Sequence, residues 1–400
     1  MTKRTPDLLS LVLVSFASLL LGLSSARFAN AQEEESATED PDTAASAEEE
    51  EKEESEGDDG FIKGRFLAAP FVITEPAIGK GLGAGLIYFH GQERTDRPRV
   101  QSGSAVANTG RRSNAPPTAT AVGAFYTSNE TAGIAAGHSR SFADDKYRTV
   151  GVLASAEINA TFYQSNQGFD FGLDMDAAYA RIQRRMGDSD VFLGLSAMWM
   201  DGFINFEPDG VTVFPPSVFD FPFTDVGIAG MAIYDSRDDS MMPGKGQLYD
   251  LTVWRHDDSF GSDFNYTNTR IKILSFHELH EKFHLGLRLD VAKNNGDAPF
   301  FMIPYVGLRG IPALRYQGEA AGAVEIEGRY DISPRWSAVA FSGAGFVSSD
   351  DPAFDDPENI FTFGAGIRFQ LFTEQNVWVG LDIAEGPEES NWYVQIGHPW

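Results

Sequence analysis

A group of three histidines is the first feature of the sequence that could do chemistry. His277, His280 and His284 lie close to Glu278, and histidine and glutamate are both zinc ligands. The helical zinc motif requires two histidines four residues apart, with glutamate directly after the first. Here the histidine before Glu278 has its partner three residues on, and the stretch joins two segments with the alternating pattern of strands. We therefore favour a polar hairpin turn over a metal site.

Acidic and glycine-rich stretches point to no other reactive site. Asp235, Asp238 and Asp239 lack the twelve-residue loop and closing glutamate of a calcium site, so we predict a turn there. The run 79–83 is not a phosphate-binding loop, because no helix pattern follows it. No Gly-x-Ser-x-Gly nucleophile elbow occurs. The sequence predicts no enzyme and no catalytic, cofactor-binding or metal-binding residue, and a hydrolase with a scattered triad is a less favoured alternative.

Most of the chain after the first sixty residues alternates apolar with polar or small residues, the pattern of a strand with one apolar and one wet face. In 361–371 the odd-numbered residues are apolar, whereas Arg368 and Gln370 lie on the other face. Segments 285–291 and 324–331 repeat this arrangement. Such strands suit a barrel wall with lipid outside and water inside.

The segment 169–179 places three carboxylates on one strand face. Asp170, Asp174 and Asp176 oppose apolar residues such as Phe171. Burying unpaired carboxylates in a dry core is very costly. We therefore predict that this face points into a hydrated lumen.

These segments predict an all-β fold, a transmembrane antiparallel β-barrel of about sixteen strands. Strands of about 9–11 tilted residues cross a bilayer, and an even number closes the barrel without an unpaired edge in lipid. The predicted strands lie near 81–91, 117–127, 130–141, 147–162, 169–184, 190–205, 223–235, 246–256, 264–278, 281–293, 300–308, 321–331, 335–346, 361–371, 375–384 and 390–400.

The connections between these segments alternate in kind. Long polar or proline-rich stretches are predicted to be outer loops: 92–117, 207–221, 307–322 and 348–359. Short breaks are predicted to be periplasmic turns, as at 141–146 and 332–335.

Two segments precede the predicted barrel, which covers 61–400. Residues 1–31 carry Lys3 and Arg4, an apolar run and a small-residue cleavage pattern, which is typical of a secretory signal peptide. Residues 32–60 hold 15 acidic residues and one lysine, so we predict a disordered acidic segment. An exported chain built of alternating strands is expected in the outer membrane of a Gram-negative cell.

The formal net charge of −27 bears on the expected partners. So acidic a chain argues against binding nucleic acid through a basic patch. Outer-membrane lipid is one expected partner. The acidic segment could also bind a basic periplasmic protein such as a chaperone, although a solvated tether is the favoured reading.

The last predicted strand carries aromatic and aliphatic residues on one face: Trp392, Val394, Ile396 and Trp400. A terminal aromatic suits the girdle at a membrane interface. A final strand that closes on an aromatic is also the sorting pattern associated with bacterial outer-membrane barrels. We predict that this strand completes the barrel.

Several stretches resemble the BamA/TamA-type bacterial surface antigen family, outer-membrane barrels that insert or translocate other proteins. The run 76–85 is similar to the glycine pattern of the family's first strand, and 235–246 resembles its Asp-x-Arg-Asp turn before a Pro-x-x-Gly strand opening. Leu-Arg-Gly-Ile at 308–311 resembles the Val-Arg-Gly-Phe/Tyr tip of its long sixth loop. Glu-Gly-Arg at 327–329 stands where the family has Glu-x-Arg. These matches are scattered over the predicted barrel.

In that family the loop tip folds into the lumen and pins an arginine against the inner wall. The resemblance assigns this role to Arg309 and Gly310, with Glu325, Glu327 and Arg329 on the following strand. An arginine beside carboxylates can form charge-assisted pairs that hold a loop in place. The alternative is an arginine on an exposed loop.

The sequence departs from the family pattern at two positions of this loop site. Ile311 replaces the aromatic of the tip, and Gly343 replaces the aspartate that would pair with the arginine. Either Glu325 or Glu327 must then serve as the partner of Arg309.

The resemblance also implies a weak seam between the first and last strands, which here would join Gly81, Gly83 and Gly85 to 392–400. Glycines near a closure lower strand stability. The implied function is insertion or translocation of protein or another envelope component. Family members collect substrates with periplasmic repeat domains that are missing from this sequence, so a separate delivery protein is an expected partner. The alternative is a passive pore that favours cations through rings of carboxylates.

Overall fold

The structure is a computed structural model. It describes residues 61–62, 65–73, 76–90, 92–93, 118–164, 167–206, 221–239, 242–348, 360–372 and 377–400. The predicted signal peptide and acidic segment, residues 1–31 and 32–60, lie outside this part of the chain. Among the described residues, no helix has the length and apolar character needed to span a membrane.

Sixteen strands form one antiparallel sheet. In chain order they are β2 (Arg65–Ile73), β3 (Gly81–Phe89), β5 (Ala119–Thr127), β6 (Ala132–Phe142), β7 (Tyr147–Gln164), β8 (Gln167–Arg185), β9 (Val191–Phe206), β10 (Phe221–Asp235), β11 (Gly246–His256), β12 (Asn265–His280), β13 (Phe283–Asp297), β14 (Ala320–Ser333), β15 (Trp336–Ser348), β16 (Ile360–Phe372), β17 (Val377–Glu385) and β18 (Ser390–Ile396). Outside this sheet, β1 (Phe61–Ile62) pairs with β4 (Gln92–Glu93). Short 3-10 turns occur at η1 (Pro76–Ile78), η3 (Asp258–Phe260) and η4 (Phe300–Met302).

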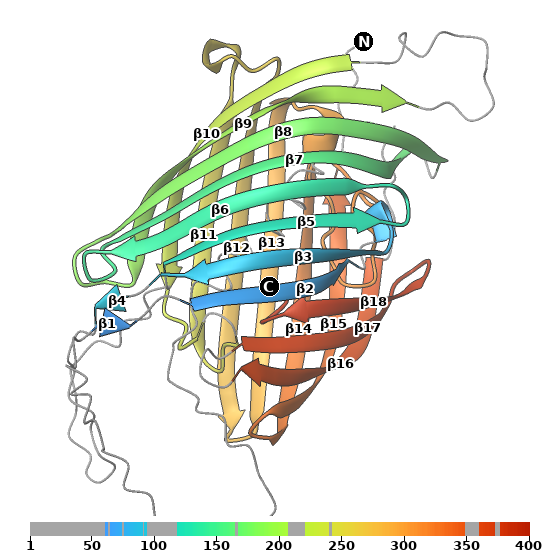
Figure 1. Ribbon diagram of the computed structural model, residues 1–400. Coiled ribbons are helices and arrows are strands. Elements are labelled where there is room, and N and C mark those ends of the chain that lie inside the picture. The colour runs from blue at the N-terminus through green and yellow to red at the C-terminus, as the bar shows by residue number, and fades with distance from the viewer. Residues whose placement is uncertain are drawn as a thin grey trace, which may run out of the picture.

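The sheet curls into a barrel in which each strand pairs with the next, from β2 round to β18 (Figure 1). β2 and β18 lie side by side. Among the described residues no hydrogen-bonded ladder joins them, and we term this junction the seam. The predicted class, a transmembrane antiparallel barrel of about sixteen strands, is confirmed.

One predicted strand is wrong and one observed strand was not predicted, although the total agrees. Residues 300–308 were predicted to be a strand, but they contain η4 and lie in the connection between β13 and β14. Residues 65–73 were not predicted to be a strand, but they form β2. The apolar run at 300–303 has the composition of a strand. Its side chains are instead buried among the inward-facing residues of the barrel strands.

The connections divide between the two ends of the barrel, because all neighbouring strands are antiparallel. The end where β2 begins and β18 ends is termed the terminus end, and the opposite one the loop end. The long connection 298–319, which includes most of the predicted outer loop 307–322, lies at the loop end. The short turn 143–146, within the predicted turn 141–146, lies at the terminus end. The stretch 92–117, predicted to be an outer loop, instead connects β3 to β5 at the terminus end.

The outer face of the barrel is largely apolar. On β16, Phe361 and Phe363 are exposed while Arg368 is buried, and on β14 Val324 and Ile326 are exposed, all as the alternation predicts. Apolar side chains thus contact the lipid outside the barrel, and polar side chains face its interior.

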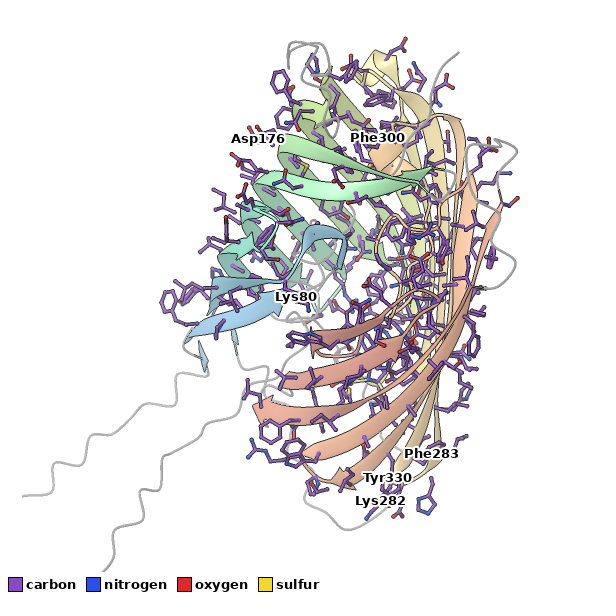
Figure 2. The ribbon with its side chains drawn as sticks, turned by 90° about the vertical axis from the view of Figure 1, so that its right-hand side faces the viewer. Lys80, Asp176, Lys282, Phe283, Phe300 and Tyr330 are labelled. Carbon is purple, nitrogen blue, oxygen red and sulfur yellow. The ribbon has the colours of Figure 1, made fainter. Side chains whose placement is uncertain are left out.

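Aromatic side chains gather on the outer face near the terminus end. Phe283, Tyr330 and Trp336 are exposed there, and Figure 2 shows Phe283 and Tyr330 beside Lys282. Aromatic rings next to cationic side chains are typical of the level of lipid headgroups. The terminus end of the wall therefore lies at a membrane interface.

Strand β8 faces the opposite way from the prediction. Asp170, Asp174 and Asp176 are exposed on the outer face, where Figure 2 shows Asp176, whereas Phe171 is only 3% exposed and packs inward. β8 has 19 residues, more than the roughly 9–11 that cross a bilayer. Its loop-end half, which carries these aspartates, therefore extends past the hydrocarbon into water. The predicted hydrated lumen at this place is wrong, because the inner side is filled by apolar side chains.

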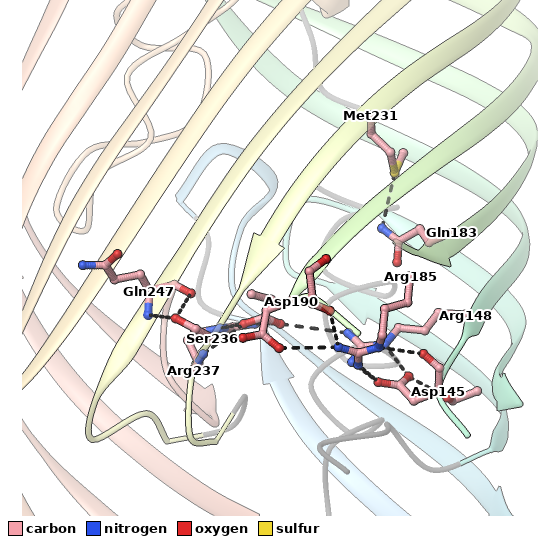
Figure 3. A network of polar contacts seen from close by, with 12 residues as sticks. Asp145, Arg148, Gln183, Arg185, Asp190, Met231, Ser236, Arg237 and Gln247 are labelled. Carbon is pink, nitrogen blue, oxygen red and sulfur yellow. Dashed lines mark hydrogen bonds and ion pairs between the residues drawn. The ribbon is translucent and has the colours of Figure 1, made fainter. Parts of the chain in front are cut away.

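A network of ion pairs ties the terminus-end turns of β6 to β11 together (Figure 3). Asp145, which is buried, accepts hydrogen bonds from the Ser141 hydroxyl and from Arg148 Nε, both at 2.7 Å, and pairs with Arg185. Arg148 also reaches Asp235, with 4.0 Å between Nη1 and Oδ2. Burial by itself would raise the pKa of Asp145, but the bonds from Arg148 and Ser141 and the charge of Arg185 outweigh burial and lower the pKa.

Replacing Asp145 tests this network. We expect Asp145→Asn to lower the free energy of unfolding by about 3 kcal/mol at pH 7, because two largely buried arginines lose their carboxylate. Since the pKa of Asp145 is lower in the folded state, its contribution is present above the unfolded pKa of about 3.9 and is lost as the pH falls through the folded pKa. Urea unfolding in detergent micelles should show a difference that shrinks below about pH 4. The exposed neighbour provides the control, Asp144→Asn, and an equal loss in both variants would contradict the role of Asp145.

Candidate functional site

The connection between β13 and β14, residues 298–319, lies inside the barrel, and we term it the inner loop (Figure 1). One side of it is apolar. Phe300 and Phe301 are buried, and the rings of Phe300 and Phe171 on β8 lie 4.9 Å apart between centroids. The apolar residues of the loop and the inward-facing residues of β7 to β10 form a single hydrophobic cluster. The strand residues in it include Ile158, Leu173, Met175, Met198, Met200, Ile204 and Phe223.

The other side of the inner loop is charged. Arg309 is buried, and its Nε donates a hydrogen bond to Glu325 Oε1 at 2.8 Å. Its Nη1 lies 2.8 Å from Glu327 Oε2 and 2.7 Å from Asp382 Oδ2. The guanidinium carbon lies 3.4 Å from the ring centre of Phe341, which suits a cation–π contact. Arg309 therefore joins the loop to β14, β15 and β17.

A second arginine completes this group. Arg368 on β16 is fully buried, donates from Nη2 to Asp382 Oδ2 at 3.0 Å and lies 3.7 Å from Glu327. We term these residues, Arg309, Arg368, Glu325, Glu327 and Asp382, the anchor cluster. Burial alone would lower the pKa of Arg309, but the surrounding carboxylates raise it above its usual range. Removing one partner from a buried ion pair leaves a charge without compensation, which costs about 3–5 kcal/mol.

Glycine at the tip of the inner loop allows a close approach to the β17–β18 turn. Gly310 has φ +95°, and a Cβ added there would lie 3.1 Å from the carbonyl carbon of Glu385 and from the nitrogen of Gly386. Its N–H donates to the Tyr393 hydroxyl of β18 at 2.8 Å. A side chain would be strained by the backbone angle and would also meet the turn.

The inner loop also contacts the β17–β18 turn through a carboxylate. Glu388 accepts hydrogen bonds from Arg315 Nε at 2.6 Å and from the Tyr316 hydroxyl at 3.1 Å. Burial would raise the pKa of Glu388, but these bonds outweigh it and lower the pKa. The loop is thus attached to the last hairpin at the tip, at Glu388 and at Asp382.

The last four residues leave the sheet and turn into the barrel. Gly397 has φ +77° and donates its N–H to the carbonyl of Trp378 at 2.8 Å. His398 Nε2 lies 3.3 Å from Glu327 Oε1, and Trp400 lies against Phe276 on the inner face of β12, with 6.0 Å between ring centroids. Burial lowers the pKa of His398, although the charge of Glu327 acts in the opposite direction.

The predicted outward position of Trp400 is therefore wrong. Trp392 and Val394 are exposed on β18, and Ile396 is the last residue of that strand. Proline has no N–H for a ladder, so Pro399 cannot continue the pairing, and the chain bends inward after Gly397.

The predicted position of the glycines at the seam is also wrong. Gly81, Gly83 and Gly85 lie in β3, which pairs with β2 on one side and β5 on the other. Gly83 leaves room for a neighbouring ring, since a Cβ there would lie 2.2 Å from Phe71 of β2. The free edge belongs to β2, because that strand precedes β3 in the sheet.

The strands at the seam are short. β2 has 9 residues and β18 has 7, whereas β8 has 19. At about 3.3 Å per residue and a tilt of about 45°, the two seam strands cover roughly 16–21 Å of the membrane normal, less than the apolar band of about 25 Å of a typical outer-membrane barrel. β18 is the shortest strand of the described sheet, so the wall is shortest along the membrane normal on that side of the seam.

The residues that the sequence analysis assigned to the loop site are only partly together. Arg309, Glu325 and Glu327 meet in the anchor cluster, whereas Arg329 Nη1 donates to the carbonyl of Pro243 at 3.1 Å near the terminus end. Asp382 and Arg368 had not been assigned to the site. A signal for them exists, because Arg368 is the one charge of its strand and Asp382, of opposite sign, lies among apolar and small residues close to it in the neighbouring strand.

The histidines and acidic turn residues take other roles. The described part of the chain contains no group of three or more His, Asp or Glu residues placed to hold a metal ion. His277 Nε2 lies 2.9 Å from the Ser275 hydroxyl, and His284 Nε2 lies 3.1 Å from Asp331. Asp238 Oδ1 accepts backbone N–H groups from both Gly244 and Lys245, so this stretch forms the predicted turn.

Comparison with solved structures decides the fold type. BamA of Haemophilus ducreyi lacking POTRA domains 1–3 matches with a TM-score of 0.56 at 11% identity, over 84% of this chain and 70% of that chain. CdiB of Escherichia coli matches with a TM-score of 0.56 at 11% identity, over 83% and 62%. CdiB of Acinetobacter baumannii matches with a TM-score of 0.52 at 9% identity, over 84% and 59%.

The chain has the fold of the BamA and CdiB barrels. The resemblance to BamA-type barrels noted in the sequence is thereby confirmed at the level of the fold. No family model and no curated protein sequence matches the chain. The chain spans only about three fifths of each CdiB protein.

Substitution of Gly310 tests whether the close contact of the loop tip with the β17–β18 turn affects stability beyond the strain of a positive φ angle. We expect Gly310→Ala to lower the free energy of unfolding by about 3 kcal/mol, from about 1–2 kcal/mol of strain and a clash of similar cost. Gly261→Ala is the matched control, because Gly261 has φ +93° but open space around it. It should show the strain alone. Urea unfolding in micelles measures both, and equal losses would show that the contact with the β17–β18 turn adds nothing.

Proposed function

We propose that this chain assists the insertion or translocation of protein or another envelope component through the seam of an outer-membrane barrel. The observation that supports this most is the unpaired edge of β2 beside β18. Unsatisfied backbone groups in hydrocarbon cost several kcal/mol each, so a passing strand that supplies hydrogen bonds would be favoured there. Such a mechanism involves no bond chemistry, so the protein would not be an enzyme.

The proposed location is the outer membrane, with the terminus end in the periplasm. The apolar outer face, the interfacial aromatics and the fold of BamA support this location. Short turns commonly lie on the periplasmic side of such barrels. Membrane lipid would then be the constant partner, and a periplasmic delivery protein or chaperone would bring the substrate to the terminus end.

In this proposal the inner loop governs the seam. It closes the lumen with its apolar side and is attached to the β17–β18 hairpin through Asp382, Glu388 and Tyr393. Release of the loop would therefore free the last hairpin, which forms one side of the seam. The seam would open only at the cost of these contacts, which keeps the resting barrel closed.

Locking the seam with a disulfide tests the proposal. The sequence has no cysteine, so an introduced pair can form only the intended bond. Cysteine pairs would be scanned between the outward positions Ala68 of β2 and Trp392 or Val394 of β18. With the barrel reconstituted in liposomes, the oxidised protein should lose at least about 90% of its ability to insert an unfolded barrel substrate, and a reducing agent should restore it, because a locked edge cannot accept a strand.

The control places the same bond inside an intact ladder. Ala84 and Ala124 lie directly opposite each other on β3 and β5, both exposed on the outer face. Their oxidation should leave insertion unchanged. A seam-locked barrel that works as well as its reduced form would refute a function at the seam.

The alternative function is a passive pore. Charged residues continue along the inner wall of β12 and β13, where Arg270 and Asp290 pair at 2.8 Å, and would line a water path if the inner loop left. Planar-bilayer conductance distinguishes the two functions. We expect small, irregular conductance for the wild type and at least a several-fold rise for Arg309→Met, because the anchor cluster loses its central cation. Arg255→Met, at an exposed arginine of the loop end, is the control, and a steady cation-selective current from the wild type would favour the pore.

A further inference from the structure

A polar cluster lies on the outer face of the barrel near the terminus end of β3, β5 and β6. His90 Nε2 lies 2.8 Å from the Thr120 hydroxyl, and the same hydroxyl lies 2.9 Å from His138 Nδ1. The two imidazole rings meet edge to face, with 5.4 Å between centroids. Thr120 and His138 are direct partners in the β5–β6 ladder. Three neighbouring strands therefore place these groups together.

The position of the cluster sets its surroundings. Leu86, Val122 and Ile134 are exposed on the same outer face and face hydrocarbon. They lie two to four residues along their strands from the cluster, towards the loop end. Tyr88 packs edge-on against His90, with 4.8 Å between ring centroids. Polar groups that face hydrocarbon are costly, whereas the level of the headgroups accepts them. The cluster therefore lies where the strands leave the apolar band.

A cation stands beside the two histidines. Arg140 is exposed on β6, two residues beyond His138, with its guanidinium carbon 5.4 Å from the ring centre of Phe142. Within the described part of the chain, Arg140 forms no ion pair with a carboxylate. An unpaired guanidinium at headgroup level is available for a phosphate.

The hydrogen bonds inside the cluster leave one nitrogen of each ring for an outside partner. His90 uses Nε2 and His138 uses Nδ1, so Nδ1 of His90 and Nε2 of His138 remain. When both rings are protonated, both remaining nitrogens are donors, and the Thr120 oxygen can accept from the two inner ones. The two outer ring nitrogens and the guanidinium of Arg140 lie on the same outer face of neighbouring strands and supply the donors and the positive charge that a phosphate diester requires.

We propose that His90, Thr120, His138 and Arg140 form a binding site for the phosphate of a glycerophospholipid headgroup, held against the outer wall at the terminus end. The acyl chains of the lipid would lie along Leu86, Val122 and Ile134. The site lies on β3, β5 and β6, the first three strands after β2, so it would hold a lipid within three strands of the seam. It does not depend on the seam being active, and the two proposals can fail separately.

Binding of dioctanoyl phosphatidylglycerol, followed by native mass spectrometry of the purified barrel in micelles, tests the site. We expect the double variant His90→Gln, His138→Gln to bind this lipid roughly tenfold more weakly, because the imidazole hydrogen bonds to the phosphate are lost.

The control variant is His277→Gln, His280→Gln, which removes two exposed histidines from the same end of the barrel on β12. It should bind the lipid like the wild type. Circular dichroism should show unchanged strand content in both variants. Equal binding by the wild type and the His90, His138 variant, or an equal loss in the control, would overturn the proposal.

A competition experiment identifies the source of the phosphate. Inorganic phosphate at the same concentration should displace little lipid, because it lacks the chains that contact Leu86 and Val122. If it displaces the lipid fully, the site takes free phosphate and the assignment to a phospholipid is wrong.

Discussion

A strand edge inside a bilayer cannot reach water, so its N–H and C=O groups must find partners in the protein or cost several kcal/mol each. Within the described sheet, β2 and β18 are the strands that keep such an edge. With 9 and 7 residues both are short, which limits the number of unpaired backbone groups at this junction. In the proposed mechanism the seam is the weakest junction of the barrel, and the inner loop holds it closed.

The inner loop supplies that support through two kinds of interaction. Phe300 and its apolar neighbours bury hydrocarbon surface against β7 to β10, which stabilises without demanding one geometry. Arg309, in contrast, fixes one position of the loop, because it pairs with three carboxylates. Loss of any one partner would leave a buried charge uncompensated, which is strongly destabilising. Glu327 takes part in this group and also pairs with His398 of the C-terminal tail. Loop, tail and last hairpin thus depend on one another.

The sequence predicted the class of fold and the number of strands, because alternation is a local property. Two of the three carboxylates around Arg309, Glu325 and Glu327, came from the family resemblance instead. It did not predict that 300–308 is a loop or that 65–73 is a strand, since a short apolar run fits either structure. Asp382 was missed because it lies far along the chain from Arg309 and meets it only across the barrel.

By itself the sequence determined which side chains of each strand share a face, because the pleat has a fixed period of two. Only the tertiary structure decided which face is inside. On β16 the polar face points inward, as Arg368 does, whereas on β8 the aspartates point outward and Phe171 points inward. The physical reason is that the choice depends on what covers each face: lipid outside β16, but water outside the long end of β8 and an apolar loop within. Residues that are distant in the sequence cover each face of a strand. The alternating pattern within the strand contains no information about them.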